Sequence, residues 1–209
     1  MSSNTDTLLT EDILHFLKQL YFGDYKSDAY KAASDRAFRD FCRTIRSKKY
    51  QALTDEEKEA SRAHVTTYIK QRILQYHQNN PDWDRQERFD AWHKETSEGI
   101  ISEFAIQKLT YGQAQKWLNM MCKYLLALGN QEVHGMLRWL HVPMDNLIIE
   151  IAVAKKMFTR PVKRWSQWSY DEYIKYQLAT RKAIEKEQGI GFPPIVWEFR
   201  SWKNENAIS

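Results

Sequence analysis

The amino-acid sequence predicts an all-α fold, and three observations support that prediction. Only 7 glycines and 5 prolines occur in 209 residues, so turn-forming residues are scarce and long helices are favoured. Apolar residues recur at three- and four-residue spacing, and no segment shows the two-residue alternation of a strand. Hydrophobic residues make up 43% and charged residues 28% of the chain, which is the balance of a globular protein.

We expect one domain over residues 1–209, in which residues 1–80 could pack as a separate helical subdomain beside a cleft. The first helix is predicted to run from an N-cap at Thr10 to Gly23, with an apolar stripe packed against the core. This stripe consists of Ile13, Phe16, Leu17 and Leu20.

Further helices are expected along the rest of the chain. They cover residues 28–47, 53–78, 83–95, 97–109, 113–128, 143–158, 169–187 and 195–205. The helix over 53–78 begins with a capping box, because Glu57 follows Thr54 by three residues. The "NNPDWD" stretch at 79–84 predicts a connection, and "TYG" at 110–112 predicts a tight turn that completes a helix-hairpin-helix.

The sequence lacks the motifs of several common sites. It has no glycine-rich phosphate loop, no GxSxG elbow and no HExxH motif. Cys42, Cys122 and six scattered histidines offer no metal-ligand spacing, so we expect no metal and no cofactor. No apolar run reaches the ~18 residues of a membrane span and no signal peptide is evident, so we expect a cytoplasmic protein without a membrane partner.

The positive charge is compatible with a polyanionic partner. The net charge is +4, and two groups of basic residues stand out. The first shares one helical face, which is either solvated or a strip for phosphates, and consists of Arg36, Arg39, Arg43 and Arg46. The second is either a basic helix end or a phosphate-binding patch and consists of Lys155, Lys156, Arg160, Lys163 and Arg164.

Lys116 and Asp145 are both predicted to lie near helix starts and to point inward. At the position of Lys116 the helix dipole disfavours a cation, which favours the neutral amine of a nucleophile. Asp145 follows Pro143 and opens an apolar helix, a position typical of an N-cap. We expect a gap between the two side chains that holds a sugar, whereas a closed ion pair would indicate a structural role.

A helix, a hairpin with glycine, a helix with an inward lysine, and "VPMD" before another helix together resemble the helix-hairpin-helix DNA glycosylase superfamily. The resemblance covers roughly residues 97–158 and is nearest to the archaeal-type 8-oxoguanine glycosylases. It implies that Lys116 attacks the sugar or positions groups and that Asp145 stabilises the sugar cation. It also implies a phosphate-binding hairpin formed by Thr110, Tyr111 and Gly112.

The resemblance further implies a base-binding set near the C-terminus, where Glu198 and Trp202 have i, i+4 spacing. The candidate base-binding residues are Trp197, Glu198, Trp202 and Asn119. The implied function is that of a monomeric DNA glycosylase that excises an altered base in repair or phage defence, with AP-lyase activity if Lys116 attacks. The alternative is a non-enzymatic helical protein that binds nucleic acid or another partner, with Lys116 and Asp145 as a structural ion pair.

Overall fold

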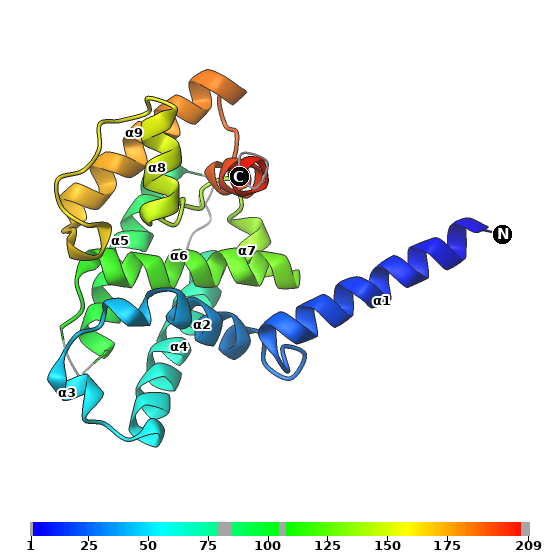
Figure 1. The fold of residues 1–209 in the computed structure, drawn as a ribbon, viewed down its shortest axis with the longest axis horizontal. Coiled ribbons are helices and arrows are strands. Elements are labelled where there is room, and N and C mark those ends of the chain that lie inside the picture. The colour runs from blue at the N-terminus through cyan, green and yellow to red at the C-terminus, as the bar shows by residue number, and fades with distance from the viewer. Residues whose placement is uncertain (1, 79–84, 105–107, 206–209) are drawn as a thin grey trace.

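The computed structural model describes residues 2–78, 85–104 and 108–205, and the regular elements in these ranges are all helical (Figure 1). The prediction of an all-α fold is therefore confirmed. The first five helices are α1 (Ser2–Phe22), α2 (Ala29–Phe41), α3 (Lys48–Gln51), α4 (Asp55–Gln78) and α5 (Gln86–Glu103). They are followed by α6 (Tyr111–Leu128), α7 (Gln131–Gly135), α8 (Asn146–Ala154), α9 (Tyr170–Gln188) and α10 (Pro194–Glu205). Two 3₁₀ helices are η1 (Cys42–Thr44) and η2 (Trp165–Gln167).

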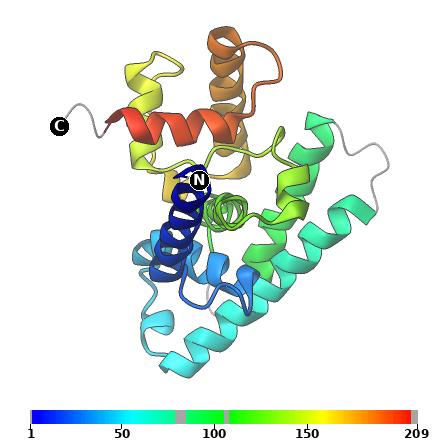
Figure 2. The same cartoon turned by 90° about the vertical axis from the view of Figure 1, so that its right-hand side faces the viewer.

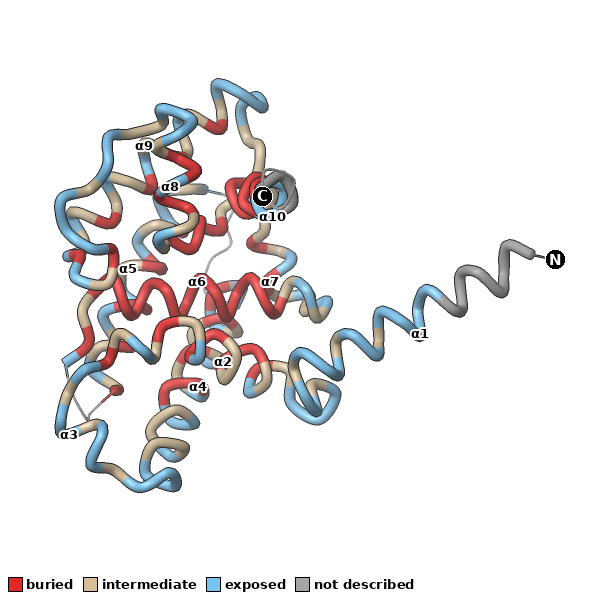
Figure 3. Tube along the Cα trace, in the orientation of Figure 1, coloured by how far each residue is buried: buried red, intermediate tan, exposed pale blue. Residues whose placement is uncertain are grey.

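Helix α6 is the central element of the fold. Figure 2 shows it nearly end-on, with α2 and α4 on one side and α8, α9 and α10 on the other. Each residue from Tyr111 to Leu125 is buried, as the red tube in Figure 3 shows. Because both faces of α6 are covered, each polar side chain on it needs a partner inside the protein.

Local sequence signals set both ends of α6. Thr110 Oγ1 accepts a hydrogen bond from the Gln113 amide at 3.1 Å, and Gln113 Oε1 accepts one from the Thr110 amide at 3.0 Å. This is a capping box, which satisfies two amides that the helix leaves unpaired. At the other end Gly129 has a φ of 86°, a left-handed conformation that glycine adopts without steric penalty.

The helices predicted over 83–95 and 97–109 are a single helix, α5, within the described residues. The polar residues Thr96 and Ser97 at the predicted break are fully buried, so their packing outweighs their weak helix propensity. Helix α5 ends at Glu103, and Phe104 leaves the helical conformation with a ψ of 72°. The predicted connection at 79–84 and residues 105–107 lie outside the described residues.

Other predicted boundaries are partly correct. The capping box of α4 is confirmed, since the Thr54 amide donates to Glu57 Oε2 at 2.8 Å and the Glu57 amide donates to Thr54 Oγ1 at 3.2 Å. Helix α2 ends at Phe41 rather than at residue 47, because the chain tightens into η1 and then extends at Ile45. Helix α8 starts at Asn146, so Pro143 lies before it rather than within its first turn.

Helix α1 projects from the domain as an arm (Figures 1 and 3). It starts at Ser2, so Thr10 lies inside the helix and its prediction as an N-cap is wrong. The predicted packing of the apolar stripe is also wrong, because these side chains are at least half exposed: Ile13 51%, Phe16 63%, Leu17 51% and Leu20 73%. The spacing identified an amphipathic helix, but the described chain does not cover its apolar face.

Hydrogen bonds between buried polar side chains cross the core between α5, α6 and α9. His93 Nε2 donates to Asn119 Oδ1 at 2.9 Å, and Asn119 Nδ2 donates to the Tyr173 hydroxyl at 2.9 Å. That hydroxyl lies 2.8 Å from His141 Nδ1, and His141 Nε2 lies 2.7 Å from Asp90 Oδ1. Burial lowers the pKa of both His93 and His141 below the usual value for histidine, because the charged imidazolium loses hydration.

This network predicts a loss of stability at acid pH. The pKa of His93 is lower in the folded protein than the ordinary 6.5 of an unfolded chain, so the unfolded chain binds the proton first as the pH falls. Below about pH 6.5, protonation of this histidine in the unfolded chain lowers the free energy of unfolding by about 1.4 kcal/mol per pH unit. We expect urea unfolding between about pH 8 and pH 5 to show this decline.

The histidine variants test the cause of the decline. His93→Gln should make it less steep, whereas His134→Gln, which changes an exposed side chain, should leave it unchanged. An identical pH dependence in His93→Gln and wild type would show that His93 does not contribute.

Candidate active site

Lys116 and Asp145 form a direct ion pair where the second turn of α6 meets the N-cap of α8. Lys116 Nζ lies 2.6 Å from Asp145 Oδ2, and the two side chains are 4% and 22% exposed. The expectation of a gap that holds a sugar between them is therefore wrong. Asp145 Oδ1 accepts a hydrogen bond from the Ile148 amide at 3.0 Å and caps α8. The carboxylate is thus held at both oxygens and still reaches the surface.

A second ion pair lies two turns further along α6. Lys123 Nζ is 2.6 Å from Glu198 Oε1 of α10, and both residues are buried. The rings of Phe199 and Trp202 each lie 5.1 Å from the Lys123 ammonium, within cation–π range. Glu198 Oε2 has no hydrogen-bond partner among the described residues. Burial raises the pKa of Glu198, and the positive charge of Lys123 opposes that shift.

Both ion pairs line one cleft of about 380 Å³, the ion-pair cleft. Its walls come from α1, α2, α6, α8 and α10, together with Arg43 of η1 and Trp165 of η2. Tyr124 of α6 also lines it and donates its hydroxyl to Asp40 Oδ2 of α2 at 2.6 Å. The cleft therefore presents two lysine-paired carboxylates, Asp145 and Glu198, beside aromatic rings.

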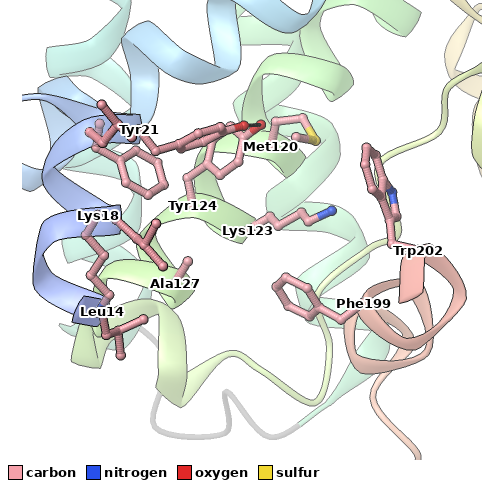
Figure 4. A pocket seen from close by; sticks show the side chains of 12 residues that line it. Leu14, Lys18, Tyr21, Met120, Lys123, Tyr124, Ala127, Phe199 and Trp202 are labelled. Atoms are coloured by element: carbon pink, nitrogen blue, oxygen red, sulfur yellow. Dashed lines mark hydrogen bonds between the residues drawn. The ribbon is translucent and has the colours of Figure 1, made fainter. Parts of the chain in front are cut away.

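An apolar pocket of about 590 Å³ adjoins the ion-pair cleft (Figure 4). Leu14 of α1 lies on one side of this pocket and Phe199 of α10 on the other, with α6 between them. The Lys123 amine points toward Trp202 at the boundary. Residues that line both the pocket and the cleft are Tyr21, Met120, Lys123, Tyr124 and Trp202. The two hollows are therefore parts of one groove.

A polar cleft of about 720 Å³ adjoins the ion-pair cleft through a different set of residues. Arg43, Asn146 and Trp165 line both clefts. Arg46 and Arg164 also line the polar cleft, and its lining residues include no carboxylate. The groove thus leads from three arginines, past the two ion pairs, to an apolar pocket with aromatic walls.

The predicted phosphate-binding turn at 110–112 is not present. Tyr111 and Gly112 are the first two residues of α6, and the Tyr111 ring is buried. The Gly112 amide donates to the Trp168 carbonyl at 3.1 Å, so it does not face a phosphate. A Cβ on Gly112 would lie 1.9 Å from the Trp165 carbonyl oxygen, which shows why glycine occupies this position. Of the three predicted residues, Thr110 does line the polar cleft.

The predicted basic run does not form one cationic surface. Three of its five side chains pair with glutamates: Lys155 with Glu187, Arg160 with Glu150, and Lys163 with Glu172. Lys156 is exposed at the end of α8 and has a φ of 58°. Arg164 is the member of the run that lines the polar cleft.

The predicted base-binding residues fall into two groups. Glu198 and Trp202 line the ion-pair cleft, and Trp202 is 45% exposed. Trp197 packs in the core and Asn119 belongs to the buried hydrogen-bond chain, so neither faces the groove. Lys123 was not predicted to belong to the site. Its seven-residue spacing from Lys116 does place both lysines on one face of a helix.

No protein-family model, curated protein or solved structure matches the chain. Among the residues that the structure describes, no three metal-ligating side chains gather at one point. Within the same ranges, no helix combines the length and the apolar composition needed to cross a bilayer. The functional interpretation therefore depends on the groove itself.

The close approach at Gly112 leads to a stability prediction. Gly112→Ala should destabilise the protein by about 1–3 kcal/mol, because the new methyl group meets a backbone carbonyl that cannot rotate away. Thermal or urea unfolding measures this effect. Gly99→Ala is the matched control within a helix, since its methyl group would meet the Tyr68 side chain, which can move. If Gly112→Ala is no less stable than Gly99→Ala, the contact with Trp165 does not explain the glycine.

Proposed function

We propose that the protein is a monomeric DNA glycosylase that hydrolyses the N-glycosidic bond of an altered base. The proposal is supported by the position of the Asp145 carboxylate, in a cleft between three arginines and an apolar aromatic pocket. A nucleotide has its parts in the same order: an anionic phosphate, a sugar that becomes cationic during bond cleavage, and a planar base. An extruded nucleotide therefore matches the groove along its length.

Asp145 supplies negative charge where the sugar becomes positive. As the C1′–N bond breaks, C1′ gains cationic character, which a preorganised carboxylate stabilises. A water molecule adds its oxygen to C1′ and loses a proton to a carboxylate of the cleft. The base leaves with the electron pair of the broken bond and takes up a proton, so the products are an abasic sugar and a free base.

Lys116 positions Asp145 in this proposal and does not attack the sugar. Lys116 Nζ is paired with the Asp145 carboxylate at 2.6 Å, and a lysine that serves as the ammonium partner of an ion pair has no lone pair for attack on C1′. Water is therefore the proposed nucleophile, and no AP-lyase step follows. This differs from the role that the resemblance implies in the bifunctional enzymes.

The far part of the groove is suited to the extruded base. Tyr124, Phe199 and Trp202 offer ring faces, and stacking of a base on an aromatic ring contributes about 1–3 kcal/mol. Glu198 Oε2 is buried at the wall of the cleft and lacks a partner among the described residues, so a small shift of the residues that cover it would let it accept a hydrogen bond from an N–H group of the base. Damaged bases and modified bases of viral DNA both carry such groups, so repair and phage defence share this chemistry.

One observation favours a second function. The direct contact between Lys116 and Asp145 and the burial of Lys116 are features of a structural ion pair. In this alternative, the protein binds nucleic acid or another partner and catalyses no reaction. The two functions differ in whether a base is released.

Asp145→Asn should abolish base release in a protein that still folds and binds DNA, with a lower unfolding free energy because Lys116 loses its counter-ion. Asparagine caps a helix as well as aspartate does, so α8 keeps its N-cap, but the charge beside the sugar is lost. We expect the rate to fall by about 10²–10³ or more. The assay uses labelled duplexes that carry different altered bases, followed by alkali to cleave abasic sites. Asp171→Asn, on the exposed first turn of α9, is the matched control and should retain wild-type activity.

Two results would count against the proposal. A folded Asp145→Asn protein with the wild-type rate would remove Asp145 from the mechanism. Wild-type protein that binds these duplexes but releases no base from any of them would favour the non-enzymatic function.

A further inference from the structure

The polar cleft concentrates positive charge that no acidic side chain neutralises. Arg43, Arg46 and Arg164 line it, and none of the three forms an ion pair with another described residue. All three are exposed, so their guanidinium groups are available to a ligand. The remaining lining is largely of hydroxyl and amide side chains, which also bind anions: Thr44, Thr110, Gln113, Asn146, Ser166 and Gln167.

The two segments that carry these arginines are hydrogen-bonded to the start of α6. Gln113 Nε2 donates to the Thr44 carbonyl at 3.2 Å and to Thr44 Oγ1 at 3.0 Å, which holds the segment of Arg43 and Arg46. Thr110 Oγ1 donates to the Ser166 carbonyl at 2.7 Å, which holds the segment of Arg164. The cleft is therefore built on segments that are hydrogen-bonded to one helix start, although Arg164 is far from Arg43 and Arg46 in the sequence.

We propose that this cleft binds backbone phosphates of the DNA strand whose nucleotide enters the ion-pair cleft. The inference rests on the proposed function, because the two clefts share Arg43, Asn146 and Trp165. Guanidinium groups bind phosphate oxygens through paired N–H donors, and several in one cleft match consecutive phosphates. The strand crosses the starts of α6 and α8, and the extruded base points toward Trp202.

The polar cleft is a different phosphate-binding site from the one predicted at the basic run of residues 155–164. Lys155, Arg160 and Lys163 are paired with glutamates, so their charges are already compensated within the chain. The predicted arginine row contributes Arg43 and Arg46 to the cleft, and the basic run contributes Arg164. Phosphate contacts that are independent of base identity would position the strand while the rest of the groove selects the base.

The test compares two triple variants that each remove three positive charges. One is Arg43→Gln, Arg46→Gln and Arg164→Gln, and the control is Lys155→Gln, Lys156→Gln and Lys163→Gln, which lie outside the cleft. Fluorescence anisotropy with a labelled duplex gives the affinity at several salt concentrations. In a plot of log affinity against log salt concentration, the slope should become shallower by about 0.9 for each phosphate contact removed. We expect the cleft variant to lose roughly 2–3 units of slope and the control to lose less than one.

Base release by the same proteins separates this inference from the proposed function. If the cleft variant keeps the wild-type salt slope while it releases a base, the phosphate site is wrong and the glycosylase proposal stands. If the slope falls in the cleft variant but wild type releases no base, the phosphate site stands and the glycosylase proposal fails. If wild type does not bind the duplex, or if inorganic pyrophosphate binds the cleft and DNA does not, the inference is overturned. Unchanged circular dichroism of both variants verifies folding.

Discussion

The burial of α6 on both sides is the constraint on which the rest of the structure depends. A polar side chain on such a helix loses its hydration and needs a partner from another element. The partners come from distant parts of the chain: Thr44 for Gln113, the Met144 carbonyl for Gln115, Asp145 for Lys116, His93 for Asn119, and Glu198 for Lys123. The polar positions of one helix therefore determine where η1, α5, α8 and α10 pack.

The groove is a consequence of two of these pairings. Lys116 and Lys123 lie two turns apart, so they bring Asp145 and Glu198 to the same side of α6. Burying an ion pair costs the hydration of both ions, and apolar residues often replace such a pair without loss of stability. Two such pairs line one cleft, where they place the carboxylates of Asp145 and Glu198 beside aromatic rings. The two ends of the groove differ in chemistry, because arginines line one end and aromatic rings line the other.

The features that could be predicted from the sequence are those set by local interactions. The capping box of Thr54 and Glu57 acts within one helical turn, and it was predicted correctly. Helix α5 continues through Ser97 because its neighbours bury it, and Gly112 is a helical residue because the Trp165 backbone lies against it. Periodicity indicates which face of a helix a side chain occupies, but not the distance to another helix. Lys116 and Asp145 could therefore be predicted to lie in one region. Neither their direct contact nor the second ion pair could be predicted in this way.

Borohydride trapping is the most direct test of the central claim, that Asp145 acts in a hydrolytic site and Lys116 is its ammonium partner. Borohydride reduces a Schiff base between a lysine and C1′ to a stable covalent adduct. During single-turnover incubation with a duplex from which the wild-type protein releases a base, we expect release without any trapped protein–DNA adduct. An adduct that maps to Lys116 would contradict the claim, because Lys116 would then be the attacking amine.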